Sequence, residues 1–112
     1  MTMTTKDRAL SYFDRVRARD AAGLALMFAD DGRLILPNGT VRIGRSEVRE
    51  TYDAIFAGAP ATPQVTATIT QGNSCSVEID AHFESGKITE TVDIFDFDNA
   101  GLITRLSIYI RG

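Results

Sequence analysis

The sequence predicts a mixed α+β fold, in which a cone-shaped, curved antiparallel sheet wraps around three helices from the N-terminal half of the chain. Three observations lead to this prediction. Apolar residues recur at helical spacing in the first half, they alternate with polar residues in the second half, and glycine-containing turns separate the alternating segments. Helices followed by consecutive antiparallel strands are typical of this fold class. A length of 112 residues suits one domain, so residues 1–112 are expected to form a single domain.

Two helices are expected before the first strand. The segment from Thr5 to about Arg19 places its apolar residues on one helical face, formed by Ala9, Tyr12, Phe13 and Val16. Asp20 is a suitable N-cap for a second, shorter helix that extends through Phe28. The apolar face of this second helix is formed by Leu24, Met27 and Phe28.

A hairpin and a third helix follow. Segments Arg33–Leu36 and Thr40–Ile43 flank Pro37-Asn38-Gly39, a composition that predicts two short strands joined by a tight turn. A helix is then expected from about Ser46 to Phe56, with Gly44 and Ser46 as alternative caps. The apolar side of this helix is formed by Val48, Tyr52, Ile55 and Phe56.

The rest of the chain predicts a four-stranded meander that begins after a surface loop over residues 58–63. Period-two alternation marks four strands, around 65–70, 77–83, 88–97 and 102–111, with turns at 72–73, 85–86 and 98–101. A twisted sheet of this kind, wrapped around helices, leaves an open mouth. Such a mouth is a natural pocket for a ligand.

Composition excludes several classes of partner. Twelve basic against fifteen acidic residues give a net charge of −3, and the chain has no run of Lys or Arg, so neither nucleic acid nor a membrane surface is expected as a partner. The single cysteine excludes an internal disulfide and a thiolate metal site. The sequence has no glycine-rich nucleotide fingerprint, so no cofactor and no metal are expected. It also lacks the pattern of a signal peptide, which predicts a cytoplasmic protein.

Asp93 is the sharpest candidate for a functional residue. Strand alternation places it on one face with Thr91 and Phe95, the face that the helices are expected to cover. Burial there raises the pKa of a carboxyl group, and a protonated carboxyl can donate a hydrogen bond to a ligand oxygen. A structural aspartate, bonded to a tyrosine or to the backbone, is the alternative.

Three other polar residues have competing interpretations. Tyr12 is either an amphipathic core residue or the partner of Asp93 in a pocket, and Tyr52 is either packing or part of the same site. His82 is the only histidine, but its alternation with Ala81 and Phe83 predicts an outward-facing surface or interface residue rather than a catalytic one. Cys75 is expected to be a small core residue.

Three stretches, in this order, carry a family resemblance: ALSYFDRVRARDAAGLALMFADDGRLILP, GRSEVRETYDAIF and VDIFDFDNAGLITRLSIY. They resemble the nuclear transport factor 2-like superfamily, and within it the ketosteroid isomerase and SnoaL-like branch. The resemblance implies a cystatin-like cone and covers most of the chain. The superfamily is functionally mixed, so the fold alone does not define a function.

The resemblance also implies roles for particular residues. In ketosteroid isomerases a helix tyrosine and a sheet aspartic acid donate hydrogen bonds to the dienolate oxygen, and Tyr12 and Asp93 occupy these positions. Tyr52 matches a tyrosine that supports the first one in some members. Leu36 stands where the proton-shuttling aspartate would precede Pro37, and Thr91 stands where limonene epoxide hydrolases have an arginine. SnoaL-type cyclases resemble the chain more loosely and work with one aspartate as acid and base, a role that Asp93 can fill.

Two hypotheses follow. In the first, the protein is an isomerase or a cyclase of the lyase type, in which Asp93 and Tyr12 act on a hydrophobic carbonyl compound such as a steroid, a polyketide or an aromatic ketone. In the second, it is a non-catalytic ligand-binding or dimeric scaffold domain. The ligand-binding residues are predicted to be Tyr52, Leu36, Phe56, Phe83, Phe95 and Ile108, within a wall that also includes Leu34, Ile79, Phe97 and Leu106. A homodimer is expected through the outer face of the sheet, around Val92, Ile94 and Tyr109, because the relatives pair there.

Overall fold

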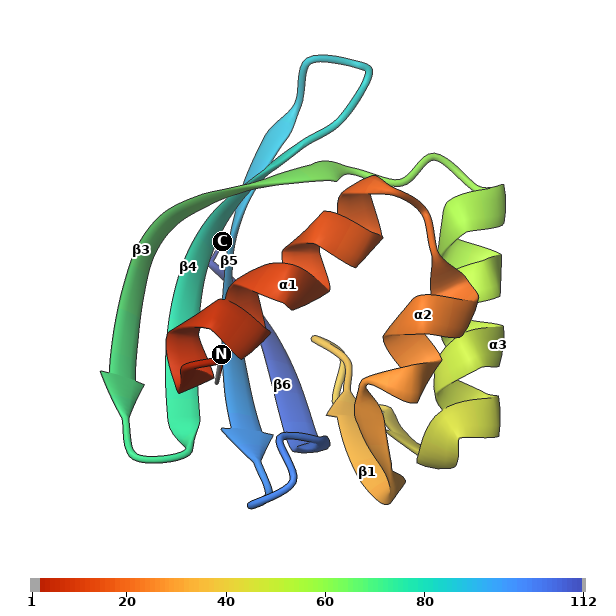
Figure 1. Cartoon of the computed structure of the whole chain (residues 1–112). Helices are drawn as coiled ribbons and strands as arrows, with labels where there is room; N and C mark the ends of the chain where they lie inside the picture. Colours follow the sequence, from red (N-terminus) through yellow and green to blue (C-terminus); the bar gives the residue numbers. More distant parts are fainter. Residues whose placement is uncertain (1–2, 112) are drawn as a thin grey trace.

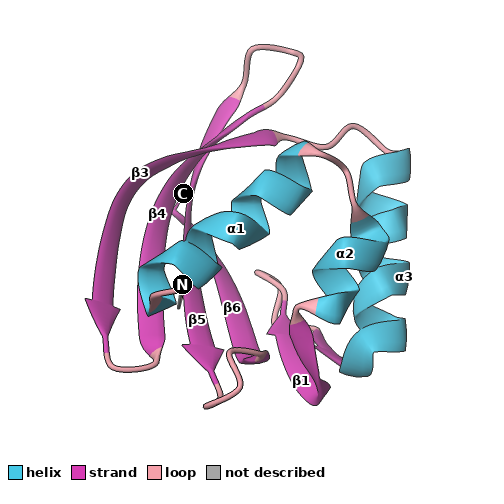
Figure 2. Cartoon of the chain, in the orientation of Figure 1, coloured by secondary structure: helices cyan, strands magenta, loops and turns pink. Residues whose placement is uncertain are grey.

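The helices and strands occur in the predicted order in the computed structural model, which describes residues 3–111 (Figures 1 and 2). The elements are α1 (Thr5–Arg17), α2 (Ala21–Leu26), β1 (Phe28–Ile35), β2 (Val41–Ile43), α3 (Gly44–Ala57), β3 (Thr62–Gln71), β4 (Ser74–His82), β5 (Ile88–Phe97) and β6 (Ile103–Arg111). The predicted α+β class is therefore confirmed. None of the helices within residues 3–111 is long and apolar enough to cross a membrane.

The six strands form one curved, unclosed sheet in the order β2-β1-β6-β5-β4-β3. The sheet curves around α1, while α2 and α3 lie side by side next to β1 (Figure 1). A bulge between Val65 and Ala67 interrupts the register of β3, the strand that bends most visibly around α1. Neighbouring strands are antiparallel except β1 and β6, which are parallel, with Leu34 opposite Leu106. Local sequence patterns did not indicate this pairing, because it joins strands from distant parts of the chain.

The first two helices begin at side-chain caps. Thr4 and Asp7 form a reciprocal capping box at the start of α1, and the Asp20 carboxylate accepts a hydrogen bond of 2.9 Å from the Gly23 N–H at the start of α2. The prediction that the second helix reaches Phe28 was wrong. The helix ends at Leu26, because Phe28 pairs with Ile103 and belongs to β1.

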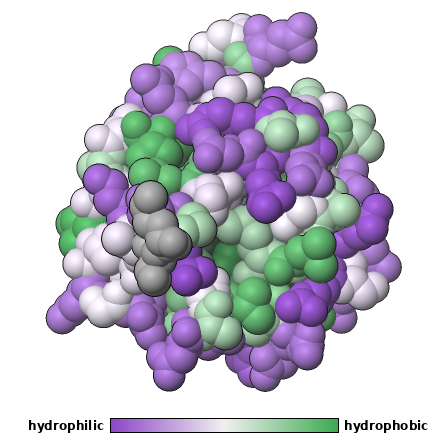
Figure 3. All heavy atoms as spheres, viewed as in Figure 1, coloured by the Kyte–Doolittle hydropathy of each residue, from purple (hydrophilic) through white to green (hydrophobic). Residues whose placement is uncertain are grey.

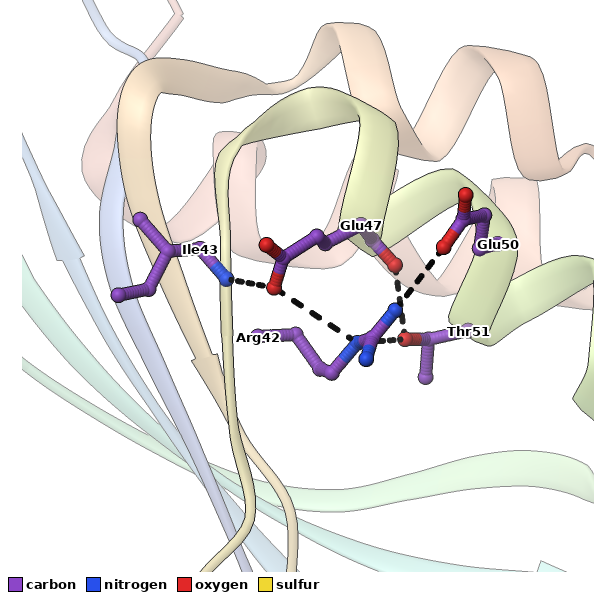
Figure 4. Close-up of polar contacts among 5 residues, drawn as sticks. All are labelled: Arg42, Ile43, Glu47, Glu50 and Thr51. Atoms are coloured by element: carbon purple, nitrogen blue, oxygen red, sulfur yellow. Dashed lines mark hydrogen bonds and ion pairs between the residues drawn. The ribbon is translucent and has the colours of Figure 1, made fainter.

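Neither predicted residue is the cap of the third helix. Helix α3 begins directly at Gly44, and Ile43 is its N-cap without a capping side chain. The Glu47 carboxylate instead accepts a hydrogen bond of 3.0 Å from the Ile43 N–H (Figure 4). Arg42 reaches over from β2 to donate to Thr51 at 3.1 Å and to Glu50 at 3.1 Å. These contacts fix the junction between β2 and α3, and α3 forms one wall of the cavity described below.

The core fills the space between the concave face of the sheet and the helices. Its largest fully buried side chains are Phe28, Phe95, Leu24, Leu34, Ile103, Leu106, Val48, Val77 and Cys75. Cys75 is thus the small core residue that its place on a strand predicted. On the face seen in Figure 3, hydrophobic residues gather in patches between hydrophilic ones.

Candidate functional site

A cavity of about 310 Å³ lies between α1, α3 and the concave face of the sheet. One wall comes from α1 through Tyr12, Phe13 and Val16, which follow one another at helical spacing. The facing wall comes from α3 through Tyr52, Ile55 and Phe56. The sheet and the α3–β3 loop complete the lining with Ala59, Pro60, Ala61, Pro63, Ile79, Ala81, Phe83, Thr91, Asp93 and Ile108. Most of these side chains are apolar, so the cavity suits a hydrophobic body with few polar atoms.

The polar groups of the cavity gather where α1, α3 and β5 meet. The hydroxyl groups of Tyr12 and Tyr52 are hydrogen-bonded to each other, and both side chains are buried. Asp93 faces the same cavity from the middle of β5, between its cross-strand neighbours Val77 and Ile108. The structure therefore brings together the three polar residues that the sequence singled out for the site.

Asp93 is the unusual member of this group. Its side chain is 4% exposed, and within residues 3–111 its carboxyl group forms neither a hydrogen bond nor an ion pair in the structure. Removal from water disfavours the charged form, and this burial raises the pKa of Asp93 from 3.8 to about 8. At neutral pH the group is therefore mostly a neutral carboxylic acid, which can donate a hydrogen bond.

Both tyrosines also keep their protons. Burial raises the pKa of Tyr12 well above 10, and the neighbouring Tyr52 and Asp93 raise it further. Burial likewise raises the pKa of Tyr52, with a smaller opposing effect from its hydrogen bond to Tyr12. Each hydroxyl has one proton, and the bond between the two hydroxyls uses one of them. One tyrosine proton and the Asp93 proton thus remain for an oxygen atom of a ligand.

The structure places the residues of the predicted wall in two environments. Phe56, Ile79, Phe83 and Ile108 line the cavity, whereas Leu34, Leu36, Phe95, Phe97 and Leu106 do not. Phe95 is fully buried, with its ring centre 5.1 Å from that of Tyr12 and 5.8 Å from that of Phe13. Alternation along a strand identifies the face on which a side chain lies. It does not show whether a helix covers that side chain completely and so separates it from the cavity. Leu36 packs against the core from the end of β1.

The sequence analysis missed the contribution of the α3–β3 loop. Residues 58–63 were predicted to be a surface loop, yet Ala59, Pro60, Ala61 and Pro63 line the cavity, and Pro63 is buried. The available signal was the uncharged, small and apolar composition of this loop. Thr91 was also missed as a lining residue, although its alternation with Asp93 placed it on the correct face.

His82 lies outside the cavity, as its alternation predicted. It lies on the outer face of the sheet, with Thr62 and Ile88 as its cross-strand neighbours, and its Nε2 atom is 3.0 Å from Oε1 of Gln64. Within the described residues, no group of three or more His, Cys, Asp or Glu side chains is arranged to hold a metal ion. The polar side chains that line the cavity are those of Tyr12, Tyr52, Asp93 and Thr91.

Comparison with known families identifies the family to which the chain belongs. The sequence model of the SnoaL-like domain matches residues 9–106, which is most of the chain. The chain belongs to the SnoaL-like domain family. No curated protein matches the sequence.

Several solved structures are similar to the chain. A protein from Sphaerobacter thermophilus is 31% identical, with a TM-score of 0.85 and 99% of each chain covered. This SnoaL-like chain also has the fold of a proposed ketosteroid isomerase from Kribbella flavida, at 21% identity and a TM-score of 0.85, with 96% of this chain and 78% of that one covered. The epoxide hydrolase/cyclase-like enzyme SalBIII, of pyran ring formation in the polyether salinomycin, is 20% identical, with a TM-score of 0.82 and coverage of 96% and 90%. The last two show a common fold.

Proposed function

We propose that this SnoaL-like protein is an isomerase or cyclase that binds a hydrophobic carbonyl compound and stabilises its enolate oxygen with Tyr12 and Asp93. The observation that carries the proposal is the position of the Asp93 carboxyl group, which faces an apolar cavity beside the hydrogen-bonded pair of Tyr12 and Tyr52. Burial in this position raises the pKa of Asp93 and favours its protonated form. Hydrogen-bond donors that already point at a developing oxyanion can supply several kcal/mol of transition-state stabilisation.

The apolar lining strengthens such donors. In a cavity that excludes water, a hydrogen bond to a negatively charged oxygen is stronger than the same bond in solvent. Tyr52 supports the site through Tyr12, because the bond between their hydroxyl groups orients Tyr12 toward the cavity. In this proposal Tyr12 and Asp93 contact the ligand oxygen, and Tyr52 is a positioning residue.

Formation of an enolate also requires a base that removes a proton from the carbon next to the carbonyl group. Among the ionisable side chains that line the cavity, Asp93 is the one that can act as a base near neutral pH. Its ionised fraction grows as the pH approaches 8. In a single-aspartate mechanism the Asp93 carboxylate first accepts the carbon proton. The carboxylic acid formed in this step then donates a hydrogen bond to the enolate oxygen beside Tyr12 and finally returns the proton to carbon, as the resemblance to SnoaL-type cyclases implies.

The first test is a fluorescence titration with 2-naphthol, whose phenol oxygen imitates an enolate oxygen on an apolar body. We expect saturable binding that weakens about tenfold in Tyr12→Phe, the effect of one lost hydrogen bond. Tyr109→Phe is the matched control, since Tyr109 is exposed on the opposite face of the sheet. Absence of binding, or binding that is equal in the wild type and Tyr12→Phe, contradicts the proposal.

The second candidate function is a non-catalytic ligand-binding or scaffold domain. It is favoured by Leu36, an apolar residue at the position of the family's proton-shuttling aspartate, which packs against the core and lies outside the cavity lining. Turnover of a matched ketone separates the two functions. Loss of turnover in Asp93→Asn, with naphthol binding retained, supports the enzyme. Naphthol binding without turnover in the wild type supports the binding function, and turnover that is unchanged in Asp93→Asn contradicts the role of Asp93 in the first proposal.

We further propose that two copies of the chain pair through the outer face of the sheet. Val92 and Ile94 are half-buried there, Tyr109 is 56% exposed, and Ile69 is 75% exposed. Sedimentation analysis tests this proposal with two arginine variants of exposed apolar residues. We expect Tyr109→Arg to produce monomers and Leu26→Arg, which changes the remote helix α2, to leave the dimer intact. A monomeric wild type contradicts the pairing.

A further inference from the structure

Arg19 has a backbone conformation that disfavours its own side chain. Its φ angle is 56°, which makes it the one non-glycine residue with a positive φ within residues 3–111. It follows the last turn of α1, where the Arg19 N–H donates to the Val16 carbonyl group at 3.0 Å and the Asp20 N–H donates to Arg15 at 3.0 Å. Glycine is the usual residue at such a helix end. Since a non-glycine residue is strained in this conformation, the presence of arginine at position 19 indicates a role for its side chain.

That side chain is held at the entrance of the cavity. Its Nη1 atom donates to the Ala61 carbonyl at 3.0 Å and to the Val16 carbonyl at 3.4 Å, and Nη2 donates to Thr62 at 3.4 Å. The guanidinium carbon lies 5.7 Å from the ring centre of Phe56. Both Val16 and Ala61 line the cavity, as Phe56 does.

The guanidinium group still has binding capacity. Its Nε–H and one Nη2–H have no partner among the described residues, and Arg19 forms no ion pair with a carboxylate there. Two neighbouring N–H groups of an arginine are the usual donors to a carboxylate that is bound through both oxygens. Arg19 is thus immobilised and charged, yet free to bind an anion.

A second hollow leads from this arginine into the cavity. It has a volume of about 640 Å³, contains Arg19 and His82, and shares Ala59, Pro60 and Phe83 with the cavity lining. On the far side of Phe83, the Lys87 ammonium group lies 5.8 Å from the ring centre and has no ion-pair partner in the part of the chain that is described. Figure 1 shows the end of α1, the α3–β3 loop and the β4–β5 hairpin at the same end of the molecule.

We propose that the ligand carries a carboxylate at its outer end, which Arg19 binds at the cavity mouth while the apolar body fills the cavity. This inference rests on the proposed function, since it assigns the inner oxygen of the same ligand to Tyr12 and Asp93. Two cations, Arg19 and Lys87, and one carboxylate, Glu84, lie around the mouth, in contrast to the overall net charge of −3. Electrostatics at the entrance therefore favour an anion.

Helix geometry sets the length of such a ligand. Arg19 follows Tyr12 by seven positions and lies two residues beyond the end of α1, so the helical rise of about 1.5 Å per residue separates the backbones of these two residues by roughly 10 Å. In this proposal a ligand that contacts both side chains spans a length of this order. The substrate class is accordingly a carbonyl or enol compound with an apolar skeleton of two or three fused rings, or an equivalent chain, that ends in a carboxylate.

The test compares two probes that differ in one charge: a naphthol with a propanoic acid chain on its far ring, and the methyl ester of this acid. We expect the wild type to bind the acid at least tenfold more tightly than the ester, with a preference that shrinks as ionic strength rises. Arg19→Gln should abolish the preference without changing the affinity for the ester. Lys87→Gln should reduce the preference less, because Lys87 is an exposed point charge.

Two further variants separate ligand recognition from a structural role of Arg19. Arg19→Gly suits the left-handed backbone and should behave like Arg19→Gln, while Arg19→Lys, which keeps the charge but loses the fork, should retain part of the preference. Equal affinities of the wild type for acid and ester overturn the inference, as does an equal loss of both affinities in Arg19→Gln. If this inference is wrong and the proposed function is right, the ester still binds and its binding still depends on Tyr12. Absence of binding by both probes overturns the proposed function and the inference together.

Discussion

Two aspartates on β5, three residues apart, show how differently the two faces of the sheet treat the same side chain. Asp96 points outward, where it accepts hydrogen bonds from Ser74 at 2.6 Å and from Arg105 at 2.8 Å. Both partners are its cross-strand neighbours, on β4 and β6. Asp93 points inward, where the described residues provide neither a hydrogen bond nor a cation. Alternation along one strand therefore separates a carboxylate that stabilises the sheet from a carboxyl group that is available to a ligand.

The comparison teaches that environment, rather than residue type, decides what a carboxyl group does. On the convex face, an arginine and a hydroxyl group compensate the charge of Asp96 and hold its carboxylate in place. On the concave face, an apolar cavity keeps Asp93 neutral. Among the described residues no fully buried side-chain oxygen or nitrogen atom lacks a partner, so the Asp93 oxygens are accessible from the cavity that this residue lines. A carboxyl group that burial keeps protonated and that faces a cavity favours a functional role over a structural one.

The largest expected effect concerns the support of the concave face. Phe95 is fully buried and stacks on Phe97 at 5.8 Å, whereas its neighbour Ile94 lies on the convex face. We expect Phe95→Ala to lower the free energy of unfolding by about 3–5 kcal/mol. Ile94→Ala is the control on the other face and should cost about 1 kcal/mol or less in the monomer. Because Ile94 lies in the proposed dimer face, both variants are measured at concentrations that keep the chain monomeric. Urea titration measures both, and equal losses would refute the difference between the faces.

Asp93 should also make stability depend on pH. Folded Asp93 keeps its proton up to a pH of about 8, while the unfolded residue releases it near its ordinary pKa of 3.8. Because the folded state holds the extra proton between these values, the contribution of Asp93 to stability is fully present below about pH 4. This contribution falls as the pH rises, by up to about 1.4 kcal/mol per pH unit. Urea unfolding of the wild type and Asp93→Asn between pH 5 and 8 measures how steeply the free energy of unfolding depends on pH in each. Parallel curves would contradict the raised pKa.

Ligand binding should follow the same proton. Acetylnaphthalene, a ketone, can accept a hydrogen bond but cannot donate one, so it needs the protonated form of Asp93. We expect its affinity to be constant below pH 8 and to fall by up to about tenfold per pH unit above it. In Asp93→Asn the affinity should not change with pH across this range. A wild-type affinity that stays constant up to pH 10 would show that Asp93 does not bind the ketone oxygen.

The smallest effect is expected on the convex face. Asp96→Asn removes a half-exposed ion pair with Arg105 and weakens the hydrogen bond from Ser74. Such a change costs about 1 kcal/mol of folding free energy. Binding of naphthol and of the ketone should be unaffected, since Asp96 lies on the opposite side of the sheet. A loss of affinity in this variant would show that the two faces are coupled.

Local patterns in the sequence predicted the order of elements and the face of Asp93, because helical spacing and strand alternation are consequences of backbone geometry. They failed where distant segments decide the structure. Phe28 continues the helical spacing of Leu24 and Met27, yet pairing with Ile103 makes it part of a strand. The same limit applies to the cavity. Phe95 and Asp93 share a face, but the packing of α1 against the sheet buries the first completely and leaves the second at a cavity.

The parallel pairing of β1 with β6 has a consequence for how the protein folds. The β1–β2 hairpin and α3 lie early in the chain, but the sheet order connects them to β3, β4 and β5 only through β6. In synthesis from the N-terminus, this early segment has no partner strand until residues 103–111 have been made. Contacts between segments so far apart close slowly, because a long loop must first be ordered. We therefore expect nascent chains that stop before β6 to leave the edge of β1 that bonds to β6 unpaired and to depend on chaperones until β6 has been made.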